Sequence, residues 1–159
     1  MAAQDTMVVT VSDVIHRPIE EVRTQFADIP YHVRANVHPE LALTVLATDG
    51  RRCSFRQEVR IAGMKQVDEV VNTVLEDGNM RSEVVGGTNQ GLTIHFSYAP
   101  AAQDATRVTA RFQIPKHGVK RLLAPLFAFG VRRAATKALE QDRRDLESGR
   151  CRAYCEARR

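Results

Sequence analysis

The chain has 159 residues, of which 43% are hydrophobic and 26% are charged. This composition fits one globular domain with its own core and excludes a disordered or repeat protein. The sequence contains no run of about 18 apolar residues, and its N-terminal stretch has neither a basic region nor a long apolar one. We therefore expect a cytoplasmic protein without a membrane span or a secretory signal.

The net charge of +4 is unevenly distributed along the chain. From residue 116 onward, twelve Lys and Arg stand against five acidic residues. The mixing of arginine with acidic residues in QDRRDLESGR is typical of a solvated helix face, so we predict no nucleic-acid binding. Peripheral contact of the basic C-terminal helix with an anionic membrane is a separate expectation.

The three cysteines are an odd number and are poorly placed for a disulfide framework. Two of them, Cys151 and Cys155, lie in the basic sequence CRAYCEARR. We expect free thiols, a single domain over residues 1–148, and a flexible basic tail over residues 149–159.

The N-terminal part of the chain predicts a strand followed by two short helices. Residues 7–15 alternate in polarity, as a strand does, and Pro18 suits the first turn of a helix that ends before Pro30. The next stretch, YHVRANVHPE at residues 31–40, predicts a second short helix or an ordered loop closed by Pro39.

Turn residues then separate six strand-like runs. Asp77-Gly78 predicts a two-residue hairpin turn, which would pair Leu75 with Met80. Extending this register places Glu69 on the apolar face of the sheet. The runs are residues 41–48, 51–61, 66–76, 79–87, 91–98 and 106–114.

Residues 117–148 predict a long helix, in which Pro125 is expected to cause a kink. Its side chains at spacings of three and four form the one apolar stripe long enough to cover a one-sided sheet. We therefore predict an α+β fold, in which a curved antiparallel sheet of about seven strands wraps around the C-terminal helix. The stripe consists of Val119, Leu122, Leu123, Leu126, Phe127, Val131, Ala134, Ala135, Ala138, Leu139, Asp142 and Leu146.

This order of elements resembles the helix-grip fold of the START-like superfamily, also called SRPBCC. The resemblance rests on VSDVIHRPIEEVRTQFADIP, LTIHFSYAP, TRVTARFQIP and ALEQDRRDLES. The superfamily includes polyketide cyclases and aromatases, coenzyme Q-binding proteins and lipid carriers. The resemblance implies a cavity between sheet and helix for a hydrophobic or aromatic molecule such as a lipid, a quinone or a polyketide.

The strand register predicts the walls of this cavity, and the resemblance places the two short helices at its mouth. A few inward polar groups in an apolar wall are what a ligand site needs. The expected ligand-binding residues are Tyr31, Arg34, Phe55, Gln57, Val59, Val71, Thr73, Ser82, Ile94, Phe96, Phe112, Leu123 and Phe127.

Two functions remain open on these residues. The leading interpretation is a carrier or sequestering module, acting as a monomer or a homodimer. The alternative is an enzyme of the cyclase or dehydratase type, in which Glu69, Tyr98, His32 or His38 moves protons. No phosphate loop or dinucleotide fingerprint is present, and we expect no cofactor.

A lesser alternative is a metal-dependent enzyme. Asp28, His32 and His38 loosely resemble the two-histidine, one-carboxylate motif in the catalytic domain of Rieske oxygenases. The six-residue spacing departs from that family's tighter pattern, and one continuous helix would turn the two histidines about 120° from alignment.

Overall fold

The computed structural model describes residues 5–157, and these form a seven-stranded antiparallel sheet with helices on one face. The strand order is β1-β7-β6-β5-β4-β3-β2, so β1 and β7 are the one neighbouring pair of described strands that is not consecutive along the chain. The elements are β1 (Thr6–Ile15), α1 (Ile19–Ala27), α2 (Ile29–Ala35), β2 (Ala42–Asp49), β3 (Arg52–Ile61), β4 (Met64–Val74), β5 (Met80–Gly87), β6 (Thr93–Ala102), β7 (Ala105–Pro115), α3 (Val119–Leu122), α4 (Ala124–Glu147) and α5 (Arg150–Glu156).

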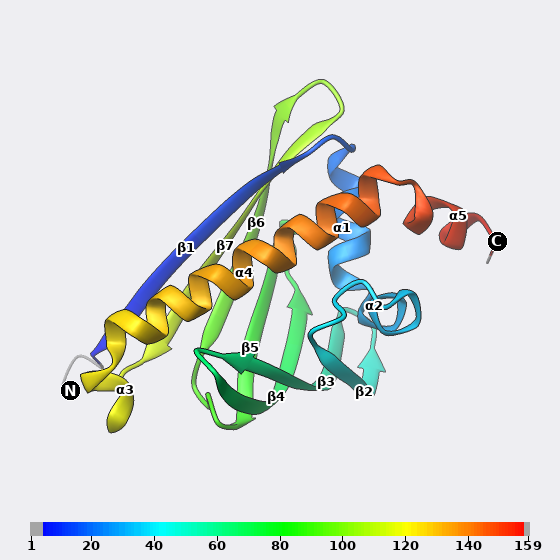
Figure 1. Ribbon diagram of the computed structural model, residues 1–159. Helices are drawn as coiled ribbons and strands as arrows, with labels where there is room; N and C mark the ends of the chain where they lie inside the picture. The colour runs from blue at the N-terminus through cyan, green and yellow to red at the C-terminus, as the bar shows by residue number, and fades with distance from the viewer. Residues whose placement is uncertain (1–4, 158–159) are drawn as a thin grey trace.

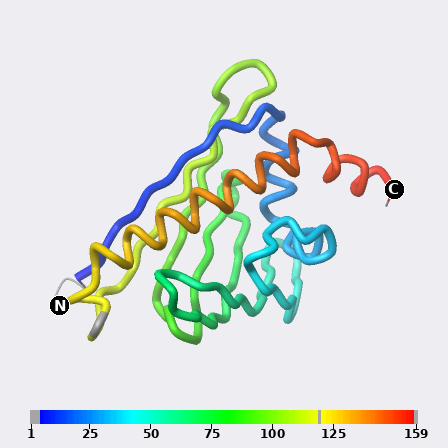
Figure 2. Tube along the Cα trace, in the orientation of Figure 1, coloured from blue at the N-terminus to red at the C-terminus, as the bar shows by residue number. Residues whose placement is uncertain are grey.

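The long helix α4 crosses the curved sheet, and α1 and α2 lie near its C-terminal end (Figure 1). The tube in Figure 2 shows that β1 runs alongside α4 for most of its length. A one-sided sheet must cover its apolar face, and α4 does so here. The predicted α+β helix-grip fold is confirmed.

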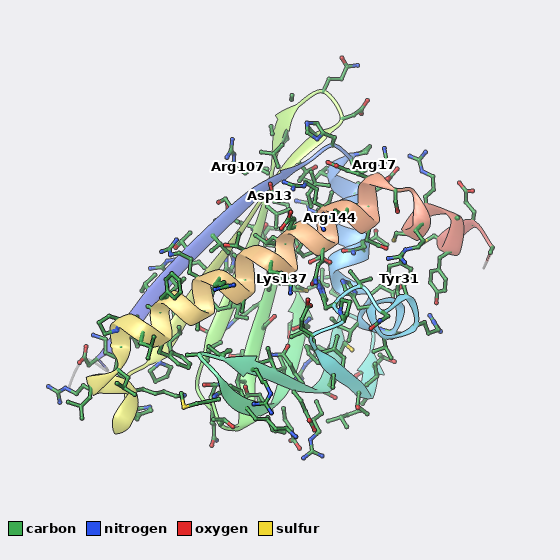
Figure 3. All side chains as sticks on the ribbon, in the orientation of Figure 1. Asp13, Arg17, Tyr31, Arg107, Lys137 and Arg144 are labelled. Carbon is green, nitrogen blue, oxygen red and sulfur yellow. The ribbon has the colours of Figure 1, made fainter. Side chains whose placement is uncertain are left out.

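Arginine contacts fix α4 against the N-terminal segment, in which Figure 3 labels Asp13 and Arg17. Arg143 donates from Nη1 to both carboxylate oxygens of Asp13 on β1, at 2.8 Å each. Arg17 donates to the carbonyl oxygens of Leu146 and Glu147, each at 2.9 Å. These carbonyls belong to the last turn of α4, where a positive charge also complements the helix dipole.

Local sequence explains the two short helices. Pro18 precedes α1, and the acidic Glu20 and Glu21 occupy its first turn, as the helix dipole favours. Asp28 caps α2 by accepting from the N–H of Tyr31 at 2.9 Å. Asn36 ends α2 in the left-handed conformation, with φ 48°, so the chain turns back instead of continuing the helix.

The β4–β5 hairpin differs from its predicted register by one residue. Val74, not Leu75, lies opposite Met80. The turn has three residues, 76–78, and the last of them, Gly78, is left-handed with φ 80°. A three-residue loop that ends in a left-handed residue is a common hairpin geometry. The predicted two-residue turn is therefore wrong.

The β3–β4 hairpin differs from its predicted register by three residues. Ile61 pairs with Met64 across the tight turn Ala62-Gly63, whereas the sequence pattern favours pairing it with Val67. Both turn residues have positive φ, 51° and 77°. This conformation matches the twist of the strands, so the hairpin closes earlier than the composition indicates.

The two register shifts, of one residue and of three, are both odd numbers. Every β4 side chain therefore lies on the face of the sheet opposite to the predicted one. Glu69 is exposed, and its predicted position inside the cavity is wrong. Val71 and Thr73 share its face and are corrected with it. Val70 and Asn72 face inward instead, each only 5% exposed.

The end of the chain packs on the core. Cys151 in α5 is buried, and Tyr154 packs against Tyr31 with ring centroids 4.9 Å apart. The predicted flexible tail is therefore corrected for residues 150–156, while residues 158–159 lie outside the described part, as do residues 1–4 of the predicted domain. All three cysteines are free thiols, as predicted. None of the described helices is long and apolar enough to cross a membrane.

Candidate functional site

A cavity of about 200 Å³ lies between the sheet and α4. Side chains from α1, α2, β2 to β7 and α4 surround it, and most are apolar. Its lining comprises Phe26, Ile29, His32, His38, Leu41, Leu43, Phe55, Gln57, Val59, Ile61, Val70, Asn72, Met80, Ser82, Val84, Ile94, Phe96, Ala110, Phe112, Val131, Ala134, Ala135, Ala138, Leu139 and Asp142.

Small side chains on α4 leave this space open. Ala134, Ala135 and Ala138 all face the cavity. A leucine or phenylalanine at these positions would reach the opposite wall, as side chains in a close-packed core do. The helix therefore covers the sheet without filling the volume beneath it.

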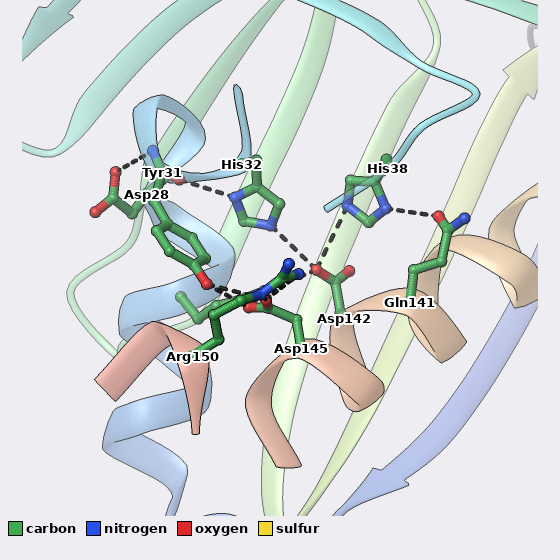
Figure 4. Close-up of polar contacts among 9 residues, drawn as sticks. Asp28, Tyr31, His32, His38, Gln141, Asp142, Asp145 and Arg150 are labelled. Carbon is green, nitrogen blue, oxygen red and sulfur yellow. Dashed lines mark hydrogen bonds and ion pairs between the residues drawn. The ribbon is translucent and has the colours of Figure 1, made fainter. Parts of the chain in front are cut away.

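Two histidines and one aspartate form the polar end of the cavity (Figure 4). The Nε2 atoms of His32 and His38 lie 3.0 Å and 3.4 Å from Oδ1 of Asp142. All three residues are buried, with exposures of 4%, 8% and 5%. The imidazole rings stack, with centroids 5.2 Å apart and an interplanar angle of 19°.

The left-handed turn at Asn36 brings the two histidines together. His32 lies in α2, whereas His38 lies just beyond the helix, where the chain has turned back. The helical separation that counted against a joint site therefore does not apply. Asp142 comes from α4, 104 positions further along the chain than His38.

The polar end continues into the core. Gln25 donates from Nε2 to Oδ1 of Asp142 at 3.0 Å. One turn further along α4, the carboxylate of Asp145 accepts from the hydroxyl of Tyr31 at 2.9 Å and from Arg150 Nε at 2.8 Å. Gln25 Nε2 also lies 3.4 Å from Oδ2 of Asp145, so this amide joins two buried carboxylates whose other partners differ.

The network shifts the pKa values of Asp142 and His38. Burial opposes ionisation of Asp142, but the charge and hydrogen bonds of His38 and His32 outweigh it, and the pKa of the Asp142 carboxyl lies well below its ordinary value. Burial likewise opposes the charged form of His38, but Asp142, Gln141 and Glu40 outweigh it and raise the pKa of His38. A negative carboxylate and an adjacent positive donor are therefore favoured at this end of the cavity.

The predicted ligand-binding residues divide into two groups. Phe55, Gln57, Val59, Ser82, Ile94, Phe96 and Phe112 line the cavity, and so do the catalytic candidates His32 and His38. The following do not line it: Tyr31, Arg34, Val71, Thr73, Leu123, Phe127, Glu69 and Tyr98.

Each residue outside the cavity has a physical reason to lie there. Tyr31 is buried against Asp145, and the guanidinium of Arg34 stacks on Tyr154. Leu123 is 41% exposed and Phe127 packs in the core, because the first turns of α4 extend beyond the cavity. Tyr98 is buried and its hydroxyl has no partner among the described residues.

Asp142 is the functional candidate that the sequence analysis missed. Its signal was visible as a carboxylate within the apolar stripe of the C-terminal helix. A buried acid on such a stripe must be paired or hydrogen-bonded. Asp28, the carboxylate assigned to the metal alternative, caps α2 instead.

A sequence model of the family described as polyketide cyclase / dehydrase and lipid transport matches residues 6–147. The chain belongs to this family. A search of curated proteins found no significant match. The cavity between sheet and α4 accords with a family in which hydrophobic ligands are bound or cyclised in general.

Several solved structures share the fold of this chain. TTHA0849 from Thermus thermophilus is 18% identical, with a TM-score of 0.79 over 90% of this chain and 99% of that one. Zhui aromatase/cyclase from Streptomyces sp. R1128 is 11% identical, with a TM-score of 0.78 over 91% and 95%. A START superfamily protein from Mycobacterium smegmatis is 20% identical, with a TM-score of 0.63 over 92% and 98%. The predicted START-like membership is confirmed.

Proposed function

We propose that the protein binds a small hydrophobic or aromatic molecule in this cavity, as a carrier or sequestering module. The observation that carries the proposal is an apolar cavity with one polar end, formed by His32, His38 and Asp142. Apolar walls supply affinity through burial, and a few fixed polar groups supply orientation. A ligand with a ring system and one hydroxyl or carbonyl group matches this arrangement.

The volume limits the ligand. An engineered cavity of about 150 Å³ holds benzene, and drug-sized ligands occupy pockets of about 300 to 1,000 Å³. A cavity of about 200 Å³ therefore favours a molecule of one or two rings, or one end of a longer molecule.

The test is native mass spectrometry of the protein purified from its own host, followed by extraction and identification of any bound molecule. In parallel, 1-naphthol is titrated while its fluorescence is recorded. We expect one lipophilic molecule per chain and saturable binding of 1-naphthol. The proposal fails if the purified protein carries no molecule and 1-naphthol does not bind up to its solubility limit.

A second candidate function, acid–base catalysis of the cyclase or dehydratase type, is favoured by the His–Asp group in the cavity wall. His38, with its raised pKa, would act as an acid, and Asp142 would hold it in place. His38→Gln should lower ring formation from a linear poly-β-keto analogue roughly tenfold or more. A carrier should show no such ring formation with either form.

For the expected membrane contact of the basic C-terminal helix, we propose the start of α4 and the preceding α3 as the contacting region. Arg150 and Arg152 are ion-paired with Asp145 and Glu21, so the tail presents less free positive charge than its composition indicates. Leu122, in α3, is 83% exposed. The nearby apolar residues Leu126 and Phe129 are also exposed, though less than Leu122. Exposed Arg121 and Arg133 flank this patch.

An apolar patch flanked by arginines suits the surface of an anionic bilayer. Sedimentation with vesicles that contain phosphatidylserine tests this contact. Binding should weaken in Leu122→Ser and with salt, whereas unchanged sedimentation of the variant would remove this patch from the proposal.

A further inference from the structure

His32, His38 and Asp142 aim one atom each at the same point beside the cavity. The three atoms, two imidazole nitrogens and one carboxylate oxygen, all lie within 4.8 Å of one another. The partners on the far side of each imidazole ring fix which ring nitrogen carries hydrogen.

The orientation of His32 is set by a backbone carbonyl. Its Nδ1 lies 2.8 Å from the carbonyl oxygen of Asp28. A carbonyl oxygen only accepts, so Nδ1 must be the N–H that donates to it. In the neutral ring, Nε2 then carries a lone pair, and this lone pair faces Oδ1 of Asp142.

The orientation of His38 is set by a chain of side chains. Its Nδ1 lies 2.9 Å from Oε1 of Gln141. The amide cannot be reversed, because Nε2 of Gln141 donates to Oε2 of Glu40 at 2.7 Å. Nδ1 of His38 is therefore also the N–H, and its Nε2 also faces Asp142.

Neutral histidines would thus place two lone pairs against a carboxylate oxygen, and protonating one ring would still leave the lone pair of the other ring facing that oxygen. Protonating both would place two stacked cations 5.2 Å apart in a buried site. It would also direct three N–H groups, including that of Gln25, at the single oxygen Oδ1. A carboxylate oxygen offers two lone pairs, so three donors exceed its capacity.

We propose that His32, His38 and Asp142 form a binding site for a divalent transition-metal ion. The ion would accept both Nε2 lone pairs and one lone pair of Oδ1, which leaves the other for Gln25. Ligand atoms about 2.0 to 2.2 Å from one ion lie roughly 3 to 3.5 Å apart at tetrahedral or octahedral angles. The observed separations from Oδ1 are 3.0 Å and 3.4 Å.

The surroundings have the features of a metal site. Histidine ligands generally donate their second N–H to a carbonyl or carboxylate, which fixes the ring, and both histidines donate to an amide oxygen of the backbone or of a side chain here. Two imidazoles and one carboxylate suit zinc and iron, and they leave coordination positions open. All three residues line the cavity, so an oxygen atom of the bound organic ligand can occupy an open position.

The test measures metal binding directly, without any activity. Protein treated with EDTA and then dialysed is titrated with Co²⁺, while visible absorption is recorded, and with Zn²⁺ by calorimetry. We expect one equivalent of either ion to bind. Asp142→Asn and His38→Asn should weaken the affinity at least about 100-fold, since each removes a ligand.

Asp145→Asn is the matched control. Asp145 is also buried and lies one turn away on the same helix, but its short hydrogen bonds are to Tyr31 and Arg150, and it shares only the longer contact with Gln25, at 3.4 Å. Its variant should keep the metal affinity within about threefold. If Asp142→Asn loses its circular dichroism signal of folding, His38→Asn decides the outcome.

Two results would overturn the site: no saturable Co²⁺ or Zn²⁺ binding by the wild type, or equal affinity in the folded Asp142→Asn or His38→Asn variant. Binding of 1-naphthol by the metal-free protein is measured separately, so the metal site and the proposed ligand cavity can fail independently.

Discussion

Filling the cavity with protein atoms separates ligand binding from folding. Ala134 lines the cavity two turns before Asp142, and Ala134→Leu adds three carbons that point into the open space. Each carbon takes about the volume of a water molecule, roughly 30 Å³. The new side chain would therefore occupy nearly half of a cavity of about 200 Å³.

The effect on stability follows from burial. Three buried carbons contribute about 2.4 kcal/mol at ~0.8 kcal/mol each, and overpacking strain subtracts about 1 to 3 kcal/mol. The free energy of unfolding should thus change little or rise by up to about 1.5 kcal/mol. A ligand that can no longer bury three of its carbons loses about 2.4 kcal/mol of binding free energy. It should bind roughly 50-fold more weakly, since about 1.4 kcal/mol is a factor of ten.

The assay pairs a 1-naphthol fluorescence titration with urea unfolding followed by circular dichroism. Thr136→Leu, on the exposed face of α4, adds a leucine outside the cavity and should leave 1-naphthol affinity unchanged. If a folded Ala134→Leu protein binds 1-naphthol as tightly as the wild type, the ligand does not occupy this cavity and the reasoning is refuted.

Further predictions concern the backbone, the thiols and alkaline pH. Gly87→Ala should destabilise the protein by more than about 2 kcal/mol in urea unfolding, because φ is +103° and the added Cβ would clash with the backbone oxygen of Val67. Gly50→Ala, at φ +52° in open space, should cost clearly less, and equal losses of stability would contradict the argument. Burial, and to a smaller extent the neighbouring Cys155, raises the pKa of Cys151 to about 12, so at pH 8 only about 1 in 10⁴ of this thiol is ionised. Cys151 should therefore react with a disulfide reagent far more slowly than the partly exposed Cys155. Mass spectrometry of the labelled peptides identifies the modified thiol, and preferential labelling of Cys151 would count against its burial. Burial, and to a smaller extent the charge of Asp142, raises the pKa of Tyr98 above its ordinary value of 10.0. The contribution of this hydroxyl to stability is therefore complete below pH 10 and is lost above it by about 1.4 kcal/mol per pH unit. Tyr98→Phe should reduce the loss of stability between pH 10 and 11 in urea unfolding, and an unchanged loss would exclude Tyr98 as its source.

Much of the fold could be predicted from local pattern. Alternation of polarity, turn residues and the apolar stripe of the last helix located every strand and the long helix, because these signals act over a few residues. The faces of β3 and β5 were also correct. The face of β4 was not, because its register with both neighbouring strands differs from the prediction by an odd number of residues, and an odd shift moves every side chain of a strand to the opposite face. Glu69 was misplaced for that reason, and Asn72 took the inward position.

The candidate site was only half visible in the sequence. His32 and His38 stood out by residue type, but their spacing argued against a joint role on one helix. The left-handed residue Asn36 removes that objection, and its conformation is a matter of three-dimensional geometry. Asp142 was visible as a polar exception in an apolar stripe, yet nothing in the local pattern connected it to the histidines.

The sequence by itself determined the class of the fold, the one-sided sheet and the helix that covers it, because periodicity and turn chemistry are local properties. The tertiary structure alone decided where the cavity lies and which polar groups meet there. A cavity exists where the alanines of α4 fail to reach the sheet, and that depends on how the helix crosses the strands. The meeting of Asp142 with the two histidines depends on the same crossing, because it joins residues more than 100 positions apart.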